Sequence, residues 1–203
     1  MNTFTRHSYE DREESPIDFE AAFKTLNDLL GRHHLSLRII VCGGYLIQQM
    51  GLRGTLDVDA FYTSTEEIDL LIQRTGTLLG INSGTTVWLN NAVSTMSDWP
   101  DSQYCETLHK FSSLTVDQVT AEYMMGMKLS STRPIDTEDV GRIIKSRELK
   151  DPIGLYHLLT GMSFRLSMVF VLDAFAFAYG DAWRAAYWKE RSKEILSLIN
   201  SDW

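Results

Sequence analysis

Two aspartates separated by one residue, Asp57 and Asp59, are the side chains of this sequence whose spacing points most directly to chemistry. They stand in the stretch TLDVDAFY, which alternates between apolar and polar residues as a β-strand does. Residues i and i+2 of a strand share a face, so the two carboxylates should lie close together and repel each other. A divalent cation relieves that repulsion, and Mg²⁺ prefers oxygen ligands. The pair predicts a Mg²⁺ site, with two solvated aspartates on an edge strand as the alternative.

A glycine pair, Gly43 and Gly44, precedes the aspartates at a predicted turn from a strand into a short helix. Backbone N–H groups at such a turn can contact phosphate oxygens, because no Cβ stands in the way. Arg53 follows and is expected to neutralise a phosphate or to pair with a carboxylate. Taken singly, these residues are explained as well by a tight turn and a surface arginine. Their order within one small unit is what indicates a nucleotide site.

The stretch GGYLIQQMGLRGTLDVD resembles the signature of the DNA polymerase beta-type nucleotidyltransferase superfamily. Its Arg-x-Thr-x-Asp-x-Asp form is similar to the branch that contains abortive-infection and toxin–antitoxin nucleotidyltransferases. The resemblance implies that Asp57 and Asp59 are catalytic and hold Mg²⁺. It also implies that the nucleotide is bound by Gly43, Gly44, Arg53 and Thr55.

A second segment, MKLSSTRPIDTEDV at residues 127–140, resembles the lysine-bearing helix of that branch and the acidic motif that follows it. The resemblance maps Lys128 to the family lysine, which is expected to contact the triphosphate as a point charge. It maps Asp136 and Asp139 to the acidic pair, although Ile135 stands where an arginine often precedes the first acid. The alternatives are a solvated lysine at position 128 and an ordinary helix N-cap at Asp136, with Asp139 in the first turn.

A third metal-binding carboxylate is usual in this superfamily, and the sequence offers three candidates for it. Glu106, in the weak strand candidate YCETL, is the first choice, and Asp117 and Glu122 are the alternatives. If none of them reaches Asp57 and Asp59, the chain carries only a pair of metal ligands.

The resemblance implies an enzyme that transfers a nucleotide from an NTP to an RNA 3′ end, a protein hydroxyl or a small molecule. Its expected partners are the NTP, an RNA acceptor and an antitoxin protein. The alternative is a nucleotidyltransferase-like module without activity that binds or regulates, for example in a toxin–antitoxin pair. A cluster of basic residues suits an RNA acceptor, but a solvated helix face explains it equally well. Its members are Arg142, Lys145, Arg147 and Lys150.

Composition narrows the class of protein. The 203 residues are 44% hydrophobic and 23% charged, which is typical of a soluble globular protein, and a net charge of −8 argues against coating nucleic acid. Cys42 and Cys105 cannot form a disulfide framework, so a reducing cytoplasm is expected, with Cys42 as a small core residue.

The N-terminus lacks the apolar core of a signal peptide. The apolar stretch 162–179 is interrupted by Arg165 and Asp173, which favours a buried helix over a membrane span.

Strands and helices must position these residues, and their predicted order indicates an α/β chain of the α+β type. We expect a nucleotidyltransferase-like mixed sheet flanked by helices at 15–150, a lead at 1–14 and a helical region at 151–203. Strands are predicted at 37–42, 55–62, 85–89, 103–108 and 113–116. Helices are predicted after Ser15-Pro16, at 45–50, after a capping box at Thr63 and Ser64, at 120–130, at 137–146 and through most of 152–199.

Overall fold

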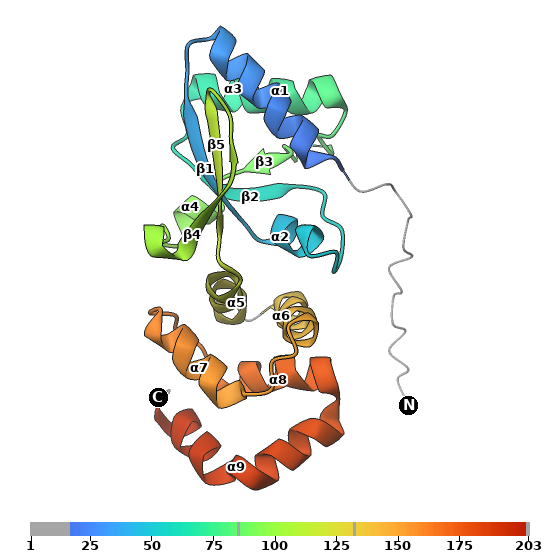
Figure 1. Ribbon diagram of the computed structural model, residues 1–203, viewed down its shortest axis with the longest axis vertical. Helices are drawn as coiled ribbons and strands as arrows, with labels where there is room; N and C mark the ends of the chain where they lie inside the picture. Colours follow the sequence, from blue (N-terminus) through green and yellow to red (C-terminus); the bar gives the residue numbers. More distant parts are fainter. Residues whose placement is uncertain (1–16, 85, 132, 202–203) are drawn as a thin grey trace.

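A five-stranded mixed sheet with helices packed around it makes up one end of the molecule, and further helices make up the other (Figure 1). The computed structural model describes residues 17–84, 86–131 and 133–201. The strand order is β3-β2-β1-β5-β4, with β1 parallel to β5 and antiparallel to β2. The predicted mixed α+β sheet is therefore confirmed. The strands are β1 (Leu37–Cys42), β2 (Val58–Phe61), β3 (Leu89–Asn90), β4 (Cys105–Lys110) and β5 (Leu114–Val119).

One face of the sheet is buried along β1 and β2, although Glu106 at its β4 edge is exposed. The cross-strand register puts Val41 beside Ala60 on this face, and both are 0% exposed. Helix α1 (Phe19–Arg32) packs on β5 and on α3 (Glu66–Leu79), and its Phe23 ring lies 6.1 Å from His109 of β4. Burial of this face supplies the hydrophobic stabilisation that holds the strands rigid.

The opposite face of the sheet carries the acidic residues Asp59 and Asp117. Register pairs Cys42 of β1 with Asp59 of β2, and Ile40 of β1 with Asp117 of β5. This face is only partly covered, by the segment that holds α4 (Val93–Met96) and a 3₁₀ turn, η1 (Ser102–Tyr104). Within that segment the Trp99 ring packs on Phe61 with centroids 5.9 Å apart. The predicted burial of Cys42 is confirmed.

Below the sheet, the helices that follow β5 pack on one another (Figure 1). Helix α6 packs chiefly on α8, and Gly141 permits the contact, since a Cβ there would lie 2.6 Å from the Phe177 ring. This packing includes α5 and α6, which precede residue 150 in the chain. None of the helices in the described ranges is both long and apolar enough to cross a bilayer. The helices are α5 (Ala121–Ser130), α6 (Pro134–Ser146), α7 (Pro152–Gly161), α8 (Met168–Tyr179) and α9 (Asp181–Ser201).

Two predicted strands are shorter than expected. The strand predicted at 55–62 begins only at Val58, and Leu56 is 59% exposed instead of facing the core. The strand predicted at 85–89 is reduced to Leu89–Asn90, while Thr85 lies outside the described residues. Both corrections follow from the edge position of β3, which pairs with β2 over only two residues.

Helix boundaries also differ from the predictions. Helix α1 begins at Phe19 with Asp18 as its N-cap, and the predicted start at Ser15-Pro16 lies outside the described residues, as does the lead. Thr65, not Thr63 or Ser64, caps α3, because its hydroxyl accepts from the Ile68 N–H. In the apolar stretch 162–179, helix begins only at Met168.

Helix α2 (Gly44–Gln49) agrees with the predicted short helix after β1. It returns the chain from the end of β1 to the loop before β2, and so brings the glycine pair beside the acidic strand.

Candidate functional site

A cleft of about 600 Å³ lies where β1 ends, between α4, α5 and the start of α6. Four of the predicted site residues line it, and so does a cation that was not predicted, Arg133. The cleft therefore joins the glycine pair and the acidic strand to the segment 127–140. The four are Gly43, Asp59, Lys128 and Asp136.

The glycine pair makes room for the acidic strand. Gly43 has φ +67°, a conformation that side chains rarely adopt, and a Cβ there would lie 2.7 Å from Oδ2 of Asp59. A Cβ on Gly44 would lie 2.6 Å from the Thr55 hydroxyl. The space that the missing side chains leave is thus taken by Asp59 and Thr55. The contact of the pair with phosphate stays a prediction.

Asp57 precedes β2, so loop contacts position it instead of a strand ladder. Asn90 Nδ2 donates to Asp57 Oδ2 at 3.2 Å, and the Thr55 hydroxyl donates to the Asp57 main-chain oxygen at 3.1 Å. The Thr55 N–H in turn donates to Oε1 of Gln48 in α2 at 3.0 Å. Asn90 was missed from the sequence because its strand is too short to show a pattern.

Asp57 also acts on Asp59 electrostatically. Burial and the neighbouring Asp57 raise the pKa of Asp59, and the opposing effects of Asn90, Lys128 and Arg133 are not enough to reverse the shift. A bound cation relieves a shift of this origin, because it favours the ionised carboxylate. The donor set of hard oxygen ligands fits Mg²⁺.

Lys128 is buried and ion-paired. Its Nζ donates to Oδ1 of Asp136 at 2.8 Å and to Oδ2 of Asp139 at 2.9 Å. The alternative of a solvated lysine is therefore wrong. The N-cap alternative for Asp136 is also wrong, because α6 begins at Pro134 and Arg133 holds the cap position.

Arg53 completes this charge network from a distant part of the chain. It binds Asp139 through two parallel hydrogen bonds, Nε to Oδ1 at 2.8 Å and Nη2 to Oδ2 at 2.7 Å. Burial acts to raise the pKa values of Asp136 and Asp139, but hydrogen bonds from Lys128, Arg53 and Ser131 bring both below the ordinary value. Lys128 and Arg53, the two cations predicted to meet a triphosphate, are thus held by the acidic pair.

Arg133 is a cation of the cleft lining, and most of its side chain is exposed. Its side chain is 70% exposed, while its Nε donates to Oδ2 of Asp136 at 2.6 Å. Arg133 lines the cleft together with Asp59. Only a three-residue separation from Asp136 marks it in the sequence, which is why it was missed.

None of the three candidates for a third carboxylate joins Asp57 and Asp59. Glu106 is paired with Gln118, whose neighbour on β1 is Val41, so it belongs to the sheet face opposite Asp59. The described residues contain no group of three or more His, Cys, Asp or Glu that could hold a metal ion. The remaining candidates have other partners, Asp117 binding Arg38 and Thr107, and Glu122 binding Arg147.

Most of the predicted basic cluster makes contacts within the protein. Arg142 donates to Asp139 at 3.2 Å, and Arg147 donates to Glu122 at 2.7 Å. The Lys150 ammonium lies 3.3 Å from the centroid of the Tyr179 ring. These contacts favour a helix face packed and paired within the fold over a surface reserved for RNA.

Comparison with known proteins adds nothing to this geometry. No family model, curated protein or solved structure matches the chain. The functional argument therefore depends on the residues of the cleft themselves.

Proposed function

We propose that this protein is a Mg²⁺-dependent nucleotidyltransferase whose site is the cleft around Asp59. The observation that carries the proposal is the placement of Asp59 in a cleft, against Gly43, with its pKa raised by burial and by Asp57. Mg²⁺ in phosphoryl-transfer sites is commonly held by one or two carboxylates together with substrate phosphates, so this pair suffices as the protein ligands.

In this proposal the cations have different roles from those that the sequence suggests, and the ion pairs of the cleft support the change. Asp57 and Asp59 would hold the metal, and Arg133 would contact the triphosphate. Lys128 and Arg53 would position the acidic pair, because they already form ion pairs with Asp136 and Asp139. Bound at the two aspartates, Mg²⁺ supplies activation of an acceptor hydroxyl and neutralisation of the departing pyrophosphate. The acceptor is an RNA 3′ end, a protein or a small molecule, and free cysteines suit a reducing cytoplasm.

The test uses NTPs labelled at the α-phosphate, Mg²⁺, and total RNA or lysate proteins as acceptors. Asp59→Asn should abolish label transfer. Arg133→Gln should weaken NTP binding about ten- to hundredfold, the usual range for a lost hydrogen bond to a charged group. Glu106→Gln is the matched control, since it removes an exposed carboxylate from the other sheet face. Transfer that persists in Asp59→Asn contradicts the proposal.

One observation favours a second function, a nucleotide-binding module without catalysis. Continuing the β1–β5 register by one residue sets buried Val119 beside Cys42, on the face where a third carboxylate would stand next to Asp59. Melting temperature measured with Mg²⁺ and each NTP separates the two functions. A shift that Asp59→Asn removes, in a protein that transfers no label, identifies the binding module.

A further inference from the structure

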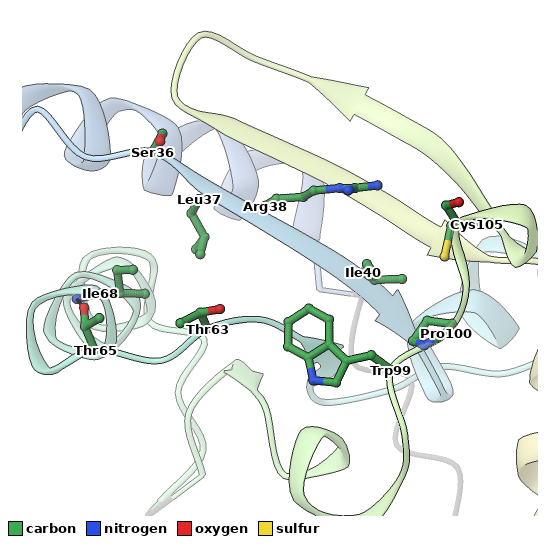
Figure 2. Close-up of a pocket in the computed structure, with 11 residues that line it drawn as sticks. Ser36, Leu37, Arg38, Ile40, Thr63, Thr65, Ile68, Trp99, Pro100 and Cys105 are labelled. Atoms are coloured by element: carbon green, nitrogen blue, oxygen red, sulfur yellow. Dashed lines mark hydrogen bonds between the residues drawn. The ribbon is translucent and has the colours of Figure 1, made fainter.

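A second cavity, of about 470 Å³, lies on the polar face of the sheet and shares no lining residue with the Asp59 cleft. Figure 2 shows Ile40 between Arg38 on one side and Trp99 on the other. The segment 93–100 separates the two spaces, since Met96 lines the cleft and Pro100 lines the cavity. Cavities of several hundred Å³ are of the size that holds small ligands.

A buried carboxylate fixes the arginine of this cavity. Asp117 is 2% exposed, and its two oxygens accept from Arg38 Nε at 2.6 Å and from the Thr107 hydroxyl at 2.7 Å. The Arg38 side chain is nevertheless 63% exposed. Within the described part of the chain, neither of its terminal nitrogens has a hydrogen-bond partner. An arginine held in this way offers two parallel N–H donors to a carboxylate or a phosphate.

The rest of the lining suits a flat apolar group. Trp99 is 48% exposed, although its ring is anchored on Phe61, and the cavity is also lined by the buried apolar residues Ile40 and Ile68. The remaining lining residues are apolar or uncharged, so Arg38 is the one charged residue among those that line the cavity. The terminal nitrogens of Arg38 can donate only to an acceptor, so they favour an anionic ligand.

We propose that this cavity binds a small organic anion with a planar ring, its carboxylate or phosphate on Arg38 and its ring between Trp99 and Ile40. The site is separate from the proposed nucleotide cleft and does not depend on nucleotidyl transfer.

Titration calorimetry on the full chain tests the proposal with three probes: benzoate, phenyl phosphate and the uncharged benzamide. At least one anion should bind with one-to-one saturation, and benzamide should bind about tenfold more weakly or not at all. Saturation by benzoate alone identifies a carboxylate ligand, and saturation by phenyl phosphate alone identifies a phosphate ligand. Either result, or both, supports the site.

Three variants locate the binding. The double change Arg38→Gln with Asp117→Asn removes the charge without leaving a buried carboxylate unpaired, and it should weaken anion binding about tenfold or more. Trp99→Ala leaves the Arg38–Asp117 pair intact and should also weaken binding. Arg74→Gln, an exposed arginine on α3, is the control and should bind like the wild type. The proposal is overturned if neither anion binds at about 5 mM, if benzamide binds as tightly as the anions, or if both cavity variants bind normally.

Discussion

At the scale of single residues, Gly43 shows how a glycine can serve a neighbouring side chain. We predict that Gly43→Ala destabilises the fold by about 1–3 kcal/mol, because the new Cβ meets both a strained backbone and Asp59 Oδ2 at 2.7 Å. Gly51→Ala is the matched control, with φ +69° and open space around its Cβ position. Urea unfolding measures the loss of stability in both variants. Equal losses would contradict the prediction, because they would show that the contact of the new Cβ with Asp59 has no destabilising effect.

In the metal-free protein, ionised Asp59 should lower the free energy of unfolding. Its pKa is raised in the folded state, so the folded state binds the proton more tightly than the unfolded chain does. Ionisation of Asp59 therefore costs stability at neutral pH, and that cost fades as the pH falls through the raised pKa. We predict that Asp59→Asn unfolds at higher urea concentration than the wild type at pH 7 without Mg²⁺. The difference should shrink toward pH 4, and a variant less stable than the wild type at pH 7 would contradict the assignment.

At the scale of elements, one buried lysine joins α5 to α6. We predict that Lys128→Met costs about 3–5 kcal/mol, because it leaves Asp136 and Asp139 buried with fewer partners. Lys145→Met, an exposed change on α6, should cost little. Urea unfolding measures both, and a near-neutral Lys128→Met would mean that the arginines alone satisfy the acids.

The same network makes stability depend on pH. The pKa values of Asp136 and Asp139 are lowered in the folded state, so their contribution is complete above the ordinary carboxyl pKa. It is lost as the pH falls through the lowered values. Unfolding free energy measured from pH 7 downward should therefore decline more gently in Lys128→Met than in the wild type.

At the scale of the whole molecule, the Arg53–Asp139 pair connects the sheet half to the helical half. We predict a single cooperative unfolding transition, seen at the same urea concentration by circular dichroism and by a variant in which Trp88 is the only tryptophan. Arg53→Gln should lower stability by about 1–3 kcal/mol in both signals, because buried Asp139 loses two hydrogen bonds. A shift confined to one signal would show that the halves unfold separately.

The sequence by itself determined the local elements and the most informative pair of residues. Apolar periodicity and a glycine pair predicted β1 at 37–42 and the short helix after it, because these signals are contained in a few consecutive residues. The Asp-x-Asp spacing placed Asp59 on the polar face of β2, but it could not show that β2 begins only after Asp57.

Only the tertiary structure decided which charges meet. Arg53 and Asp139 are 86 residues apart, and no spacing rule connects them. Strand register put Glu106 on the wrong face and Val119 beside the site, since a shift of one residue in pairing exchanges the two faces of a strand. Periodicity tells which face of an element is buried, whereas the packing of distant elements sets the partners of each buried charge. The residue that this packing leaves available in the cleft, Arg133, therefore emerged from the fold and not from the motif.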